Sequence, residues 1–245
     1  MKPIEIWIPD GSPVMSRAGD HLRDRGIKVV RKATPATTHL LLPVPIRSGA
    51  EIPPEIPEGI PILGGNLPTD LFSGHNTIDL LQDPQYLYDN AAITAHCAIR
   101  IAAERLPRVW AGCQVLIIGW GRIGKFLAKY LNALGAGICV AARKPEDRAL
   151  IRALGFQAAA PDRLAGAVGR YRVIFNTAPA LILPEDVTSQ CKEDAVLIDL
   201  ASKPGIEGVR VIAARGLPGK MAPESSGDLI GRTALRLIHA EEVSI

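Results

Sequence analysis

Residues 115–127 read Val-Leu-Ile-Ile-Gly-Trp-Gly-Arg-Ile-Gly-Lys-Phe-Leu. An apolar strand precedes the pattern Gly-x-Gly-x-x-Gly and the start of a helix follows it, which is the order found in dinucleotide-binding domains. Gly119 permits the tight turn, Gly121 leaves space for a pyrophosphate at the positive end of the helix, and Gly124 lets that helix pack closely on the strand. We therefore predict a dinucleotide site; the alternative is a degenerate Rossmann domain. The predicted site comprises Gly119, Trp120, Gly121, Arg122, Ile123 and Gly124.

The end of the second predicted strand, residues 138–142, indicates which nucleotide binds. Chains that select NAD place Asp or Glu about 20 residues past the glycines. This chain has Ala142 there, followed by Arg143 and Lys144. A carboxylate would repel a 2′-phosphate, whereas a guanidinium holds one by charge-assisted hydrogen bonds. The sequence thus favours NADP, with Arg148 as a further candidate; the alternative is that Arg143 and Lys144 form a solvated turn closing on Pro145.

Composition narrows the class of protein. The chain has 245 residues, of which 47% are hydrophobic and 22% charged, so it can bury the cores of two α/β domains. A net charge of +3 with scattered basic residues indicates neither a nucleic acid nor a membrane partner. No apolar run reaches the length of a membrane span or signal peptide, so we expect a cytoplasmic protein. The cysteines lack Cys-x-x-Cys spacing and predict reduced, buried thiols with neither disulfides nor a metal: Cys97, Cys113, Cys139 and Cys191.

The predicted fold is α/β, with a parallel-sheet Rossmann domain and a smaller N-terminal α/β lobe. Residues 1–89 form this substrate-facing lobe, in which the prolines of residues 43–61 predict a long surface loop. Its expected strands are 4–8, 27–30, 39–42 and 60–63, and its expected helix is 14–25. A last helix at about 227–241, with Ser225 and Ser226 as caps and Asp228 in its first turn, is expected to pack back on the lobe as residues 226–245.

Residues 90–225 form the predicted Rossmann domain. It begins with a linking helix at about 91–106 that starts near Thr94. After the glycine motif come a helix at about 125–134 and a further helix from about Asp162. The remaining strands are expected at 156–159, 171–175, 195–200 and 209–213, and their continuous apolar character is typical of a buried parallel sheet.

Residues just past each strand are candidates for ligand contact, because ligands of open parallel sheets lie at the carboxyl ends of the strands. Asn176, Thr177 and Ala178 follow the fourth strand and are expected to position the nicotinamide or the substrate. Lys203 and Lys220 follow the fifth and sixth and would hold an anionic substrate. Each lysine has the alternative of a solvated side chain in a turn.

His96 is the candidate acid or base. In the first turn of the linking helix, the positive helix end would favour its neutral imidazole, which can take a proton or donate to a carboxylate. An ordinary packed histidine is the alternative.

Four stretches resemble the A subunits of dipicolinate synthases. They are residues 88–95 (Tyr-Asp-Asn-Ala-Ala-Ile-Thr-Ala), 174–180 (Ile-Phe-Asn-Thr-Ala-Pro-Ala), 197–205 (Leu-Ile-Asp-Leu-Ala-Ser-Lys-Pro-Gly) and 216–223 (Gly-Leu-Pro-Gly-Lys-Met-Ala-Pro). The resemblance implies a fold like that of D-2-hydroxyacid dehydrogenases and an NADP-linked oxidation of a dihydro- or hydroxytetrahydro-dipicolinate precursor to dipicolinate for endospores, in the mother-cell cytoplasm. It also implies a small dicarboxylate as substrate, a homo-oligomer, and a partner that is a flavoprotein B subunit.

One departure from the family pattern lies at residues 93–98, which read Ile-Thr-Ala-His-Cys-Ala where the family tends to have Pro-Thr-Ala-Glu-Gly-Ala. The segment before the linking helix also looks shorter than usual. Two other functions therefore stay open: a non-catalytic NADP-binding regulatory subunit, and a reductase like the D-2-hydroxyacid dehydrogenases. The Arg, Glu and His set of the latter is not apparent at the matching strand ends.

Overall fold

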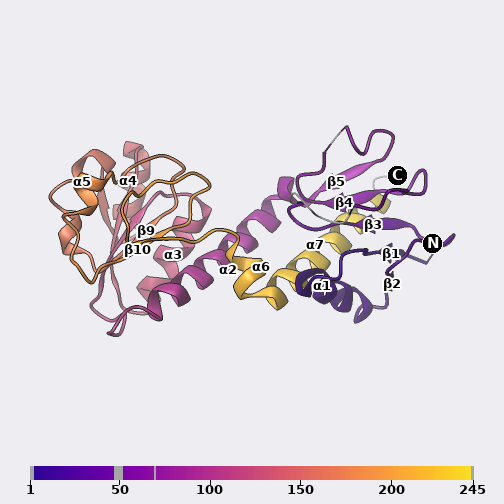
Figure 1. Ribbon diagram of the computed structural model, residues 1–245, viewed down its shortest axis with the longest axis horizontal. Coiled ribbons are helices and arrows are strands. Elements are labelled where there is room, and N and C mark those ends of the chain that lie inside the picture. The colour runs from indigo at the N-terminus through magenta and orange to yellow at the C-terminus, as the bar shows by residue number, and fades with distance from the viewer. Residues whose placement is uncertain (1–2, 47–51, 69, 244–245) are drawn as a thin grey trace. The chain divides into compact units, whose positions relative to one another are not determined.

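Two parallel sheets organise the computed structural model, which describes residues 3–46, 52–68 and 70–243 (Figure 1). The chain divides into two compact units, one made of Met1–Asn90 with Pro218–Ile245 and the other of Ala91–Leu217. The predicted α/β class, with a Rossmann domain and a second α/β lobe, is confirmed. None of the described helices is both long and apolar enough to cross a bilayer.

The first unit contains five parallel strands in the order β2-β1-β3-β4-β5. The four expected strands are present, and β5 is a strand that the turn-rich sequence before it did not suggest. No helix or strand occurs among the described residues of the proline-rich loop 43–61, of which 47–51 lie outside the described residues. The bounds are β1 Glu5–Trp7, β2 Lys28–Val30, β3 His39–Leu41, β4 Ile62–Gly64 and β5 Thr77–Asp79, with α1 at Pro13–Arg23 after β1.

Helix α7, Pro223–Val243, packs against α1 within this unit. Gly227 and Gly231 permit a close approach, because a Cβ at Gly227 would crowd the carbonyl oxygen of Val14 and one at Gly231 would lie 2.9 Å from that of Ala18. The predicted start of this helix is wrong: it begins four residues earlier, at a proline suited to the first turn. Ser225 and Ser226 therefore lie inside the helix and are not its caps.

Asp228 belongs to the contact between α7 and α1 and not to the first turn of α7. Its Oδ1 accepts a hydrogen bond from Arg17 Nε at 2.7 Å and pairs with His21 Nδ1 at 3.1 Å. Burial raises the pKa of the Asp228 carboxyl, but the hydrogen bonds from Arg17 and His21 outweigh it, so that the pKa lies below its ordinary value.

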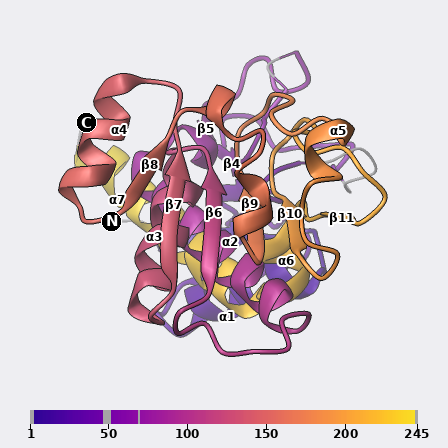
Figure 2. The same ribbon diagram turned by 90° about the vertical axis from the view of Figure 1, so that its left-hand side faces the viewer.

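The second unit contains six parallel strands in the order β11-β10-β9-β6-β7-β8, which is the doubly wound order of dinucleotide-binding domains (Figure 2). Its strands are β6 Gln114–Ile118, β7 Gly137–Ala141, β8 Gln157–Ala159, β9 Val173–Asn176, β10 Val196–Asp199 and β11 Val211–Ala213. Its helices include α3 Arg122–Ala133, α4 Pro145–Ala153 and α5 Glu185–Thr188, and α6 Leu217–Met221 follows at the boundary of the units.

The helix expected from Asp162 is wrong. Two 3-10 turns, Pro161–Arg163 and Val168–Arg170, replace it. Gly166, at φ +75°, adopts a left-handed conformation that a continuous α-helix excludes.

Helix α2 spans Pro84–Ala103, so the expected start near Thr94 is also wrong. Asp83 Oδ1 accepts a hydrogen bond from the backbone N–H of Tyr86 at 2.7 Å, and Pro84 occupies the first helical position. The consequence is that His96 lies in the interior of the helix and not in its first turn.

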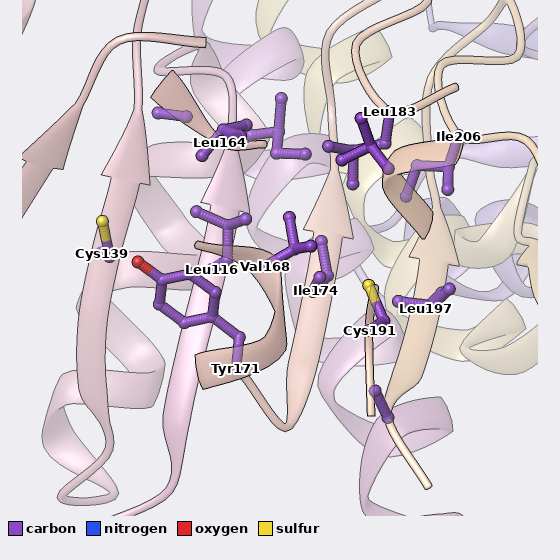
Figure 3. Close-up of a cluster of buried hydrophobic side chains, with 14 residues drawn as sticks. Leu116, Cys139, Leu164, Val168, Tyr171, Ile174, Leu183, Cys191, Leu197 and Ile206 are labelled. Carbon is purple, nitrogen blue, oxygen red and sulfur yellow. The ribbon is translucent and has the colours of Figure 1, made fainter. Parts of the chain in front are cut away.

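The core of the second unit lies on one face of the six-stranded sheet (Figure 3). Leu116, Ile174 and Leu197 come from the neighbouring strands β6, β9 and β10. Val168 and Tyr171 cover them from the connection before β9. Cys139 and Cys191 lie in the same cluster. Burial raises the pKa of all four thiols, which keeps them protonated at neutral pH and makes them poor nucleophiles.

Candidate functional site

A cavity of about 910 Å³ opens at the carboxyl ends of β6, β7 and β9, where open parallel sheets bind ligands. The cavity brings together seven of the residues predicted to bind the cofactor. They are Gly119, Trp120, Gly121, Arg143, Lys144, Thr177 and Ala178.

The three glycines of the motif differ in what the fold demands of them. Gly119 adopts φ +102°, which favours glycine, and a Cβ there would overlap Thr177 Oγ1. A Cβ at Gly124 would overlap the carbonyl oxygen of Gly119, so that glycine is needed for the helix to start close to the strand. Gly121 has an ordinary extended conformation, φ −77° and ψ −171°, and a Cβ there would meet no protein atom within 4 Å. The protein itself does not require Gly121, whereas a phosphate lying against the backbone would.

The first turn of α3 is suited to an anion. Gly121 is its N-cap and supplies no side-chain hydrogen bond, and no acidic residue occupies the first turn. Arg122 is exposed and Ile123 half-buried, and both contribute backbone N–H groups to this turn. Such groups carry partial positive charge and need acceptors, which a pyrophosphate provides.

Three cations line the cavity wall here: Arg143 and Lys144 lie in the loop between β7 and α4, and Arg148 lies on α4. Arg148 donates hydrogen bonds to the carbonyl oxygens of Ala142 at 2.8 Å and Arg143 at 2.5 Å, so its guanidinium ties the loop to α4. Arg143 and Lys144 are exposed and line the cavity. Arg148 thus serves as a positioning residue for the two cations.

Two acidic residues, Asp147 and Asp162, also line the cavity, and Asp147 lies beside the basic loop. It lies in the first turn of α4, where a carboxylate complements the helix dipole. The sequence did not single out Asp147 or Asp162 as ligand contacts, whereas Pro179 of the same wall follows the fourth strand directly after the predicted residues 176–178. The only sequence signal of the two acids was their place just after α4 begins or a strand ends.

Asn176 is completely buried and does not line the cavity. Its Nδ2 donates to Asp199 Oδ1 at 2.9 Å and to the carbonyl oxygen of Ala178 at 3.0 Å, while its Oδ1 accepts from the N–H of Ala178 at 3.1 Å. Thr177 Oγ1 donates to the carbonyl oxygen of Ile118 at 2.9 Å. Asn176 therefore shapes the loop at 177–178, which itself faces the cavity.

Asp199 is the acceptor at the centre of this arrangement; the sequence placed it at the end of the fifth strand of this domain, in the stretch 197–205, but no role was predicted for it. Besides Asn176, it accepts hydrogen bonds from the N–H groups of Ala201 at 3.1 Å and Gly205 at 2.7 Å. The two strand ends β9 and β10 are thereby joined through one buried carboxylate. Its only sequence signal was an acid ending an apolar strand.

Asp199→Asn is expected to lower the free energy of unfolding by about 2–4 kcal/mol, because an amide N–H₂ would face donors that need an acceptor. Thermal or urea unfolding measures this loss. Asp186→Asn, at an exposed position in α5, is the matched control and should change stability by less than about 0.5 kcal/mol. If the two variants were equally stable, Asp199 would not be the acceptor that holds the ends of β9 and β10 together.

The three predicted catalytic residues are exposed side chains. Lys203 lies after β10 and His96 on α2, and neither lines the cavity. The helical environment expected for His96 is wrong, because its position in the interior of α2 removes the influence of a helix N-terminus. Lys220 lies on α6 and belongs to the first unit, whereas the cavity belongs to the second.

Known proteins share parts of this sequence and its fold, although no family model matches the chain. The A subunit of dipicolinate synthase from Bacillus subtilis (strain 168) is 32% identical over 164 residues, or 62% of this chain and 55% of that protein. The matched part of the chain thus spans about half the length of this relative.

Two solved structures share the fold. The A chain of dipicolinate synthase from Bacillus subtilis has a TM-score of 0.83 at 21% identity, and the match covers 100% of this chain and 99% of that one. L-Alanine dehydrogenase has a TM-score of 0.69 at 15% identity, and the match covers 96% and 89%. The fold is therefore one that NAD(P)-dependent dehydrogenases use. Over 164 of its residues the chain is similar in sequence to the dipicolinate synthase A subunit, and its fold is like that of these dehydrogenases.

Proposed function

We propose that the chain binds NADP and acts as a dipicolinate synthase A subunit, oxidising dihydrodipicolinate or its hydroxytetrahydro precursor to dipicolinate. The observation that carries the nucleotide part is Gly121: a glycine that the fold does not need stands at an uncapped helix N-terminus, in the wall of a cavity of suitable size. The homology to the A subunit supports the substrate class.

Different residues of the cavity would contact different parts of the nucleotide. Backbone N–H groups at the start of α3 receive the pyrophosphate, and Gly121 leaves it room. Arg143 and Lys144 hold the 2′-phosphate, with Arg148 fixing their loop. Thr177 and Ala178, held by Asn176, form the wall beside the nicotinamide end.

NADP, when bound, would supply the acceptor for a hydride that leaves a ring carbon of the substrate. The chain's part is to hold the two carboxylates of the substrate and to take up the proton that is released with the hydride. Lys203 and Lys220 are the proposed carboxylate partners and His96 the proposed proton acceptor; all three are exposed and available to a ligand. The gain of an aromatic ring favours the product.

The biological setting is part of the same proposal and rests on the homology. The chain would act in the cytoplasm of the mother cell, as a homo-oligomer, together with a flavoprotein B subunit. No nucleic acid or membrane partner enters the proposal.

A second candidate is an NADP-binding regulatory subunit without its own turnover. It is favoured by one observation: Lys203 and His96 do not line the cavity, and no histidine or cysteine does among the described residues.

One experiment separates these functions. The purified chain is given NADP and freshly prepared dihydrodipicolinate, with and without the flavoprotein subunit, and dipicolinate is followed by its ultraviolet absorbance. Formation above the rate without the chain is expected. NADPH binding without any turnover would favour the regulatory subunit, and an absence of binding to either coenzyme would overturn both.

A further inference from the structure

We propose that a cavity between α3 and α4 is a second binding site, for a small carboxylate with a flat apolar body. This cavity of about 470 Å³ is within the volume range of small-molecule sites. It is distinct from the dinucleotide cavity and shares with it only Trp120. The proposal does not depend on the function proposed above.

One wall of the second cavity is apolar and exposed. Leu150 lies on α4 and Leu154 is the C-cap residue of that helix, four positions later, and they keep 48% and 55% of their surface accessible. Phe156 continues this wall, and its ring lies edge-on to that of Trp120, with centroids 6.4 Å apart. Large apolar side chains gathered at a concave surface indicate a ligand with an apolar body.

The opposite wall is cationic. Lys125 and Lys129 lie one turn apart on α3 and are both exposed, and Lys125 Nζ is 5.9 Å from the centre of the Trp120 ring. No carboxylate lines the cavity, and neither lysine has an ion pair with a described residue. Like charges on neighbouring turns repel each other, so a bound anion would relieve a local cost.

The hydrogen-bonding groups in the cavity wall indicate which polar group the ligand should carry. Apart from the amide of Asn132, the polar side chains that face the cavity are two lysine ammonium groups, which only donate hydrogen bonds. Donors along one side and apolar groups along the other match a planar aromatic carboxylate, with the carboxylate toward α3 and the ring toward α4.

The test uses two probes of the same shape, 2-naphthoate and its uncharged analogue 2-naphthamide, in equilibrium dialysis against the purified chain. Naphthoate is expected to bind saturably and at least about tenfold more tightly than the amide, since one charge-assisted contact supplies a factor of this order. The double variant Lys125→Gln with Lys129→Gln is expected to bind naphthoate as weakly as the amide.

Two control variants locate the site. Lys192→Gln removes an exposed lysine of the same unit that does not line the cavity, and Arg143→Gln removes a cation of the dinucleotide cavity. Both should bind naphthoate as the unaltered protein does. The proposal is overturned if naphthoate fails to bind saturably, binds no better than the amide, is unaffected by the double variant, or loses affinity in either control.

Discussion

Gly121→Ala is expected to leave the protein folded and to weaken NADPH binding by about 10–100-fold. The backbone at Gly121 is in an ordinary extended conformation, and the new methyl group would meet no protein atom. It would instead occupy space needed by a phosphate held against the N-terminus of α3, and a methyl group forced into such a contact costs about 1–3 kcal/mol. Titration of NADPH fluorescence measures the affinity, and thermal unfolding measures the stability.

Gly124→Ala is the matched control from the same motif. Its methyl group would overlap the carbonyl oxygen of Gly119, so the helix start must shift and the unfolding temperature should fall. The two variants thus separate a glycine needed by a ligand from one needed by the fold. If Gly121→Ala binds NADPH as tightly as the unaltered protein, no phosphate approaches this turn and the proposed nucleotide site is wrong.

The glycine motif was predictable because its determinants are local. Strand, turn and helix follow one another within 13 residues, and the conformations of Gly119 and of the start of α3 depend on neighbours in the sequence. The sheet that contains β6 could also be predicted from the sequence, since its buried strands are continuous apolar runs.

Features that depend on distant partners or on competing local signals were not predictable in the same way. Asn176 was expected to contact the ligand. Its side-chain amide instead donates a hydrogen bond to Asp199, which lies 23 residues later in the chain. For α2, the sequence contains the capping residue Asp83 and the proline that follows it. The prediction instead relied on the alanine-rich stretch farther along and therefore placed the start near Thr94. That shift led directly to the wrong environment for His96.

Replacing both Arg143 and Lys144 by Ala is expected to raise the Kd for NADPH by about 10–100-fold and that for NADH by less than about threefold. A hydrogen bond to a charged group contributes about 1.5–3 kcal/mol, and only NADPH carries the 2′-phosphate that these cations would hold. Fluorescence titration of each reduced coenzyme measures both constants.

Asp147 lies in the same wall and should increase the difference between the losses for NADPH and NADH. Its carboxylate would repel the 2′-phosphate, and the two cations would no longer offset that repulsion. Arg152→Ala is the matched control: it removes a cation from α4 that does not line the cavity. It should change neither affinity by more than about twofold, as a screened surface charge does. Tighter binding of NADH than of NADPH by the unaltered protein, or equal losses for both coenzymes in the double variant, would show that the loop after β7 is a solvated turn and that another part of the cavity selects the nucleotide.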